Sequence, residues 1–197
     1  MNFKQLQIEL YRYLLIEDPD VRTTGIIKQI LNDTILSFAR IKNWLRLQSF
    51  SEITLDGSNS YVINDIITDY FLGEIALISE SGIEYLKYNL KNYNTLSSKT
   101  NAYAVYGDKL YVEGTDTILG FYYMSLGLFP LDNDTDTNSA ITNYHDVIIN
   151  LAVINYLKFI GDGSYQSEIP FYQDKLQTLM KLENRTINQG GNNVVTR

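Results

Sequence analysis

Three groups of side chains have types and spacings that could support chemistry: an acidic loop, a histidine–aspartate pair and a set of glutamates. In the acidic loop, Asp132, Asp134 and Asp136 alternate as the oxygen ligands of a calcium loop do. An EF-hand loop also needs a glycine after its third ligand and a closing glutamate, but Thr137 and Asn143 stand at those positions. We therefore expect no metal, and interpret this segment as a solvated loop before a helix.

His145 is the only histidine, and Asp146 follows it directly. A hydrolytic triad needs a base beside a nucleophile and an acid that orients the base. Neighbouring positions on a helix point to different faces, and the sequence has no Gly-x-Ser-x-Gly motif. We expect Asp146 to favour a helix start instead, and we predict no catalytic residue.

Pairs of carboxylates can cleave glycosides, and Glu74, Glu80, Glu84 and Glu113 are candidates for such a pair. The spacing of these glutamates does not identify any two of them as a catalytic pair. The sequence has neither a phosphate-binding loop nor a dinucleotide motif. The chain also has 0 cysteines, which excludes thiolate chemistry. We therefore expect a protein that is not an enzyme and has no cofactor, and keep a carbohydrate-active or cell-wall-degrading enzyme as the alternative.

The composition is that of a globular protein with an acidic surface. The 197 residues carry a net charge of -7, and 45% of them are hydrophobic. No stretch approaches the length of uncharged apolar residues that spans a membrane. A net negative charge argues against a function in nucleic-acid binding, including that of a regulator that binds through a pair of helices. The 16 tyrosines favour interfaces, because the ring buries area while its hydroxyl finds a partner.

Four segments show the apolar period of amphipathic helices. Asp18-Pro19-Asp20 ends the first, and Gly161-Asp162-Gly163 separates the last two. On the final helix, five apolar residues are expected to face inward: Ile169, Tyr172, Leu176, Leu179 and Met180. The expected helices cover residues 2–17, 24–48, 141–160 and 164–183, with Trp44 on or beside the core.

The middle of the chain changes to the alternation of strands. Residues 50–55 and 61–63 flank an Asp-Gly-Ser-Asn turn and suggest a hairpin. We expect further strands over residues 74–78 and 117–124, a short helix over 83–92, and a hairpin over 102–113 with a Gly107-Asp108 turn. The predicted fold is α+β and mainly α: an antiparallel four-helix bundle with an inserted small antiparallel β-sheet region.

The expected organisation follows from this order. Residues 1–49 and 126–186 form the helical bundle, and residues 50–125 form the β-rich insertion. Residues 187–197 form a flexible C-terminal tail, because their glycine and asparagine pairs cannot bury apolar area. Within the tail, Val194-Val195-Thr196 is prone to pair with a sheet edge.

The layout resembles the head–tail connector proteins (adaptor, or head-completion proteins) of tailed bacteriophages over residues 3–183. The features that carry the resemblance are Trp44, the segment Ile53–Ile63 around Gly57-Ser58, the tyrosine-rich hairpin Tyr103–Val112, the strand Thr117–Met124 before Leu128-Phe129-Pro130-Leu131, the helix at Tyr144–Ala152, and the final helix.

The resemblance implies a virion structural protein that joins the portal vertex of the capsid to the tail and lines the DNA channel. It implies a ring, usually of twelve copies, that contacts the portal protein and a tail or second ring protein. Genomic DNA passes through its lumen without specific binding, and no membrane is involved. The protein would be assembled in the host cytoplasm and reside in the virion neck. Connectors of this kind reach the portal through terminal arms, so the candidate portal contacts are Asn192, Asn193, Val194, Val195, Thr196 and Arg197.

Overall fold

The computed structural model describes residues 1–58, 60–88 and 101–190, which belong to two compact units. The helical unit combines Met1–Leu47 with the chain from Leu126 onward, and the β unit is Gln48–Ser125. Of the described residues, 46% are helical and 23% are in strands. The protein is therefore an α+β protein.

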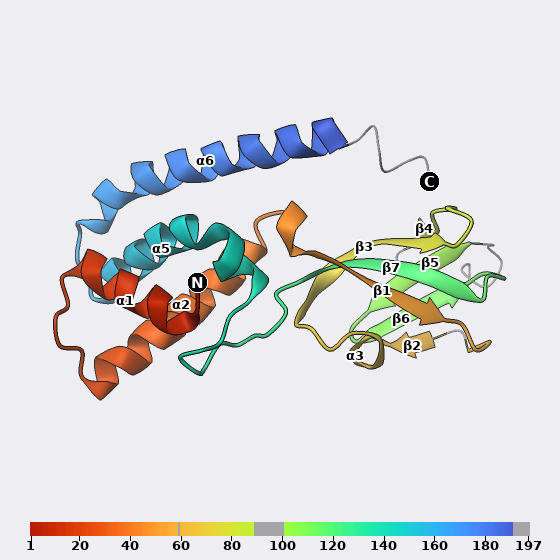
Figure 1. Ribbon diagram of the computed structural model, residues 1–197, viewed down its shortest axis with the longest axis horizontal. Helices are drawn as coiled ribbons and strands as arrows, with labels where there is room; N and C mark the ends of the chain where they lie inside the picture. The colour runs from red at the N-terminus through yellow and green to blue at the C-terminus, as the bar shows by residue number, and fades with distance from the viewer. Residues whose placement is uncertain (59, 89–100, 191–197) are drawn as a thin grey trace. The chain divides into compact units, whose positions relative to one another are not determined.

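Within the described residues, the helical unit has four long helices, and α1, α2 and α6 all pack against α5 (Figure 1). Buried residues such as Ile141, Ile148 and Ile154 follow one another along α5, as expected for a helix that others surround. The elements are α1 (Phe3–Leu14), α2 (Val21–Ala39), the 3-10 turn η1 (Leu45–Leu47), α5 (Ser139–Phe159) and α6 (Tyr165–Gly190).

The helices begin and end where side chains satisfy their terminal backbone groups. Asn2 and Gln5 form a reciprocal capping box at the start of α1. Asp20 caps α2 by accepting a hydrogen bond from the N–H of Thr23 at 2.6 Å. At the end of α2, the Trp44 ring N–H donates to the Phe38 carbonyl at 2.9 Å. That carbonyl lies in the last turn of α2, and it also accepts from the Ile41 N–H, just beyond the helix, at 3.1 Å.

Over residues 48–58, 60–88 and 101–125, the β unit has two sheets and the short helix α3 (Ile63–Ile66). The three-stranded antiparallel sheet has the order β1 (Gln48–Thr54), β7 (Ile118–Ser125), β3 (Phe71–Ser79). The four-stranded sheet has the order β2 (Ser60–Val62), β6 (Lys109–Glu113), β5 (Ala102–Tyr106), β4 (Leu86–Lys87), and its β4–β5 pair is parallel.

One apolar core joins the two sheets of the β unit. Burial raises the pKa of both Tyr85 and Tyr103 to about 12. The Tyr85 hydroxyl donates to Asp116 at 2.7 Å. A Cβ at position 114 would overlap the Tyr85 ring and its hydroxyl oxygen, so glycine fits beside them. The core residues are Ile53, Ile63, Ile67, Leu77, Tyr85, Tyr103, Leu110, Val112, Leu119, Phe121 and Tyr123.

This architecture corrects the predicted fold class. The antiparallel four-helix bundle with a small inserted sheet is wrong, because the strands form two sheets around a core of their own. The prediction underestimated the strands partly because β3 has two irregularities. Its register with β7 shifts between Phe71 and Gly73 and again between Glu74 and Ala76. Such bulges break the alternation by which a strand is recognised in a sequence.

Two local predictions are also wrong. In the described part of residues 83–92, Leu86–Lys87 is a strand, and Tyr85 is the buried residue rather than Ile83 or Leu86. The hairpin between residues 50–55 and 61–63 does not form, because β1 pairs with β7 and β2 pairs with β6. The hairpin over residues 102–113 and the strand near 117–124 are confirmed as β5–β6 and β7.

Candidate functional site

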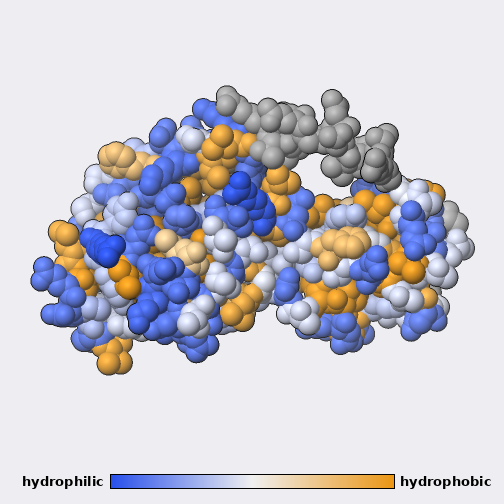
Figure 2. Space-filling view, viewed as in Figure 1, coloured by the Kyte–Doolittle hydropathy of each residue, from blue (hydrophilic) through white to orange (hydrophobic). Residues whose placement is uncertain are grey.

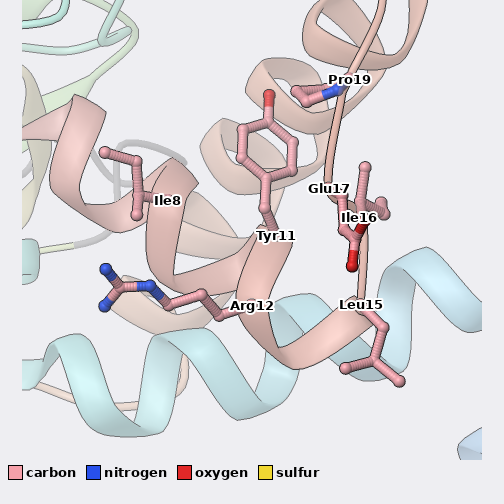
Figure 3. Close-up of a pocket in the computed structure, with 7 residues that line it drawn as sticks. All are labelled: Ile8, Tyr11, Arg12, Leu15, Ile16, Glu17 and Pro19. Carbon is pink, nitrogen blue, oxygen red and sulfur yellow. The ribbon is translucent and has the colours of Figure 1, made fainter.

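A groove of about 660 Å³ lies in the helical unit where α1 leads into α2 (Figure 3). The α1 residues that line it follow the i, i+3, i+4 spacing of a single helix face. The lining residues are Ile8, Tyr11 and Arg12 from this face, the C-cap Leu15, and Ile16, Glu17 and Pro19 from the connection to α2.

Two different faces of α1 carry apolar side chains. Phe3, Leu6 and Leu10 are fully buried and hold α1 in the helical unit. Ile8 and Leu15 line the groove instead, and are 39% and 87% exposed. A surface helix normally turns polar residues to solvent. The groove therefore presents apolar side chains that the folded chain leaves exposed.

Leu15 has an unfavourable backbone conformation. It caps α1 with φ 56° and ψ 36°, in the left-handed region. A residue with a Cβ costs about 1–2 kcal/mol in this conformation, and glycine or asparagine is the usual choice at a helix end. The Leu15 side chain is nevertheless almost fully exposed, so the subunit gains no burial that offsets this cost. The left-handed conformation itself ends α1, because it lets the Leu15 N–H donate to the Arg12 carbonyl at 3.3 Å and the Ile16 N–H donate to the Tyr11 carbonyl at 3.0 Å.

The second candidate surface is α6. Its five apolar residues that were predicted to face inward, Ile169, Tyr172, Leu176, Leu179 and Met180, are only half-buried. Phe171 and Leu182 on the same helix are 64% and 54% exposed. Figure 2 shows apolar residues in orange among polar ones at the surface of the helical unit. In the subunit, α6 thus keeps much of its apolar surface in solvent.

Glu183 is the one buried residue of α6 over positions 165–184, at 6% exposed. The Tyr144 hydroxyl and the Leu45 backbone N–H, at 3.2 Å, both donate to its carboxylate. The Lys42 ammonium lies 3.7 Å from the same carboxylate. Burial and the hydrogen bond to Glu183 raise the pKa of Tyr144, so its hydroxyl remains a donor. This Glu183 cluster (Glu183, Tyr144, Lys42 and Leu45) ties α6 to α5 and to the segment after α2.

The acidic loop has a structural role. The Asp136 carboxylate accepts hydrogen bonds from the N–H groups of Asp132 and Asn133, both at 2.8 Å, and these bonds lower the pKa of Asp136. The Asp134 carbonyl accepts from the Lys4 N–H at 3.0 Å, and its carboxylate pairs with the Lys4 ammonium at 3.1 Å. The loop therefore docks the first turn of α1.

The other sequence candidates also have structural contacts. His145 Nε2 lies 3.2 Å from the Asp146 carboxylate. Glu74 forms an ion pair with Lys87, and the pKa of Tyr103 is raised first by burial and then by the nearby charges of Glu74 and Glu84. Glu80 lies apart from them, in a hollow beside Phe50 and Tyr122. We assign no chemical role to Asp146, Glu74, Glu80, Glu84 and Glu113.

The candidate portal contacts Asn192, Asn193, Val194, Val195, Thr196 and Arg197 lie outside the described residues. The helix α6 extends to Gly190, four residues into the segment expected to be a tail.

Over residues 1–58, 60–88 and 101–190, no cluster of three or more histidine and acidic side chains is suited to bind a metal ion. No helix in the same part of the chain is long and apolar enough to cross a membrane. A scan against models of known protein families gives no match, and no curated protein is significantly similar to the chain.

Proposed function

We propose that the protein is a virion structural protein, a ring-forming adaptor that joins the portal vertex of a tailed bacteriophage to its tail and lines the DNA channel. The observation that carries this proposal is Leu15, an apolar residue at a costly φ of 56° that is 87% exposed. In a ring, the neighbouring copy would cover this side chain and so offset the cost of its conformation.

A ring needs two different surfaces on each subunit, because its contacts are head-to-tail. The helical unit has two such surfaces, the groove along α1 and the half-exposed helix α6. We assign the ring contact to these surfaces, with α6 of one copy in the α1 groove of the next. Both surfaces expose apolar residues that a neighbouring copy would bury in such a contact.

The charge of the β unit fits a channel through which DNA moves without being held. Residues Gln48–Ser125 include ten acidic and four basic side chains, so the β unit carries -6 of the net charge of -7. Such a surface repels phosphates and supplies no counterion release on contact with DNA. In this role the partners are further copies in a ring of twelve, the portal protein and a tail or second ring protein. Asn192–Arg197 would provide contacts to the portal.

The Leu15→Gly variant tests the ring contact. Glycine adopts φ 56° without the cost of a Cβ, so we expect the folded subunit to gain about 1 kcal/mol of stability. The same variant removes the apolar side chain from the groove, so ring formation should weaken. Thermal unfolding and sedimentation at high protein concentration measure the two effects separately.

A matched control removes an exposed apolar side chain elsewhere. Ile83 is 50% exposed in the β unit, and Ile83→Ser should leave ring formation unchanged. If Leu15→Gly assembled as readily as the natural chain, Leu15 would not be part of the contact.

A further inference from the structure

A second groove, of about 440 Å³, lies within the β unit between β1 and β2. Residues 52–54 line its β1 side and residues 60–62 line its β2 side. Successive side chains of a strand point to opposite faces of its sheet. A groove lined by three consecutive residues of each strand therefore runs along the backbone edges of the strands rather than across a face.

Both strands are edge strands, and they belong to different sheets. All seven residues of β1 pair with β7 in an unbroken register, and all three residues of β2 pair with β6. In the part of the chain that the structure describes, no strand pairs with the other edge of either one. An edge of this kind presents a row of N–H and C=O groups that can pair with a further strand.

Asp56 and Ser58, which follow β1, take part in hydrogen bonds with each other and with Tyr61 of β2. The Tyr61 hydroxyl donates to the Asp56 carboxylate and accepts from the Asp56 N–H, both at 3.2 Å. The Ser58 hydroxyl donates to the same carboxylate at 2.6 Å. These contacts link Asp56 to Ser58 and Tyr61, while β1 pairs with β7 and β2 pairs with β6.

The groove is negatively charged. Glu52, Asp56 and Asp65 line it, and none of its lining residues is basic. Hydrogen bonds from Ser58 lower the pKa of Asp56, so this carboxylate is ionised at neutral pH. Glu52 and Asp65 are exposed on β1 and α3 and face the same groove. Positively charged side chains are the complement of this arrangement.

We propose that this groove binds an extended basic segment of a partner protein, which adds a β-strand along the free edge of β1. Backbone hydrogen bonds to β1 would supply affinity, and lysine or arginine side chains facing Glu52 and Asp65 would supply specificity. The groove lies entirely within the β unit, so this binding does not depend on ring formation.

A fluorescent peptide, acetyl-Thr-Lys-Val-Arg-Val-Lys-Thr-amide, is a direct probe of the groove. We expect saturable binding to the full chain, measured by fluorescence anisotropy. The double variant Glu52→Gln/Asp65→Asn should weaken this binding about tenfold, because it removes two of the three carboxylates. The matched control Glu80→Gln/Asp108→Asn makes the same charge change at exposed positions outside the groove, and should change the affinity by less than about twofold.

Two further peptides separate strand addition from general charge attraction. One has glutamate in place of each lysine and arginine, and the other is N-methylated at alternate residues to remove backbone donors. Neither should bind measurably, and the parent peptide should slow amide exchange in residues 48–54. Equal affinity for the N-methylated peptide would overturn the proposal, as would equal weakening by the two double variants or no saturable binding at millimolar peptide.

Discussion

Replacement of Trp44 by alanine should destabilise the subunit by about 3–5 kcal/mol. Trp44 is 0% exposed, and its ring stacks on Phe38 with centroids 4.5 Å apart. The Tyr144 ring lies 5.2 Å away on a tilted plane. The variant would leave a cavity where these rings meet and would also remove one of the donors to the Phe38 carbonyl. Because that carbonyl ends α2, the loss affects both the core and the end of the helix.

Denaturant unfolding followed by circular dichroism measures this effect without relying on the fluorescence of the chain's 1 tryptophan. Trp44→Phe is the control, because it keeps a stacked ring but removes the N–H donor. It should cost about 1–3 kcal/mol, less than the alanine variant. An unfolding midpoint for Trp44→Ala equal to that of the natural chain would show that Trp44 is not a core residue.

Glu183→Ala should cost about 2–4 kcal/mol, although Glu183 is a charged residue near the end of a surface helix. Its removal leaves the Tyr144 hydroxyl and the Leu45 N–H without their acceptor in a buried place. Lys42, 3.7 Å from the carboxylate, would lose its counter-charge. Since Glu183 is the buried residue on α6, amide exchange over residues 165–184 should also accelerate.

Asp174→Ala on the same helix is the control, because Asp174 is exposed, and it should change the stability by less than about 0.5 kcal/mol. Tyr144→Phe combined with Glu183→Ala should cost less than the sum of the two single changes, since both break one hydrogen bond. Additive costs in this double-mutant cycle would show that the Glu183 cluster is not coupled.

The parts of the fold that depend on local sequence were predictable. The helical period located α1 and α5, and the Gly107-Asp108 turn located the β5–β6 hairpin. The burial of Trp44 was predicted from its place beside an apolar stripe and is confirmed. Each of these features depends on residues close together in the chain, where period and turn chemistry are informative.

The parts that depend on distant residues were not predictable in the same way. The second helix was expected to reach Gln48 but ends at Ala39, because Trp44 turns into the core and caps it. The pairing of β1 with β7 joins residues 64 to 76 positions apart, from Thr54 with Ile118 to Gln48 with Met124. The sequence instead favoured pairing with the nearer segment 61–63. The groove lies between β1 and β2, which do not pair with each other.

The candidate site was missed for a related reason. Glu183 interrupts the apolar series Leu176, Leu179 and Met180 at helical spacing, and this interruption could have indicated a buried carboxylate. Its partners Tyr144 and Leu45 are far away in sequence and could not be identified. Leu15 stands just before the Asp18-Pro19 break where a glycine would be usual, but its left-handed backbone is visible only in the structure.

Electron microscopy of the protein mixed with the portal of its phage tests the adaptor role most directly. We expect a closed ring of this chain docked on the portal, and we expect the ring to be lost when Leu15→Asp places a charge in the α1 groove. Portal particles that remain undecorated at high protein concentration, with the chain still monomeric, would contradict the proposed function.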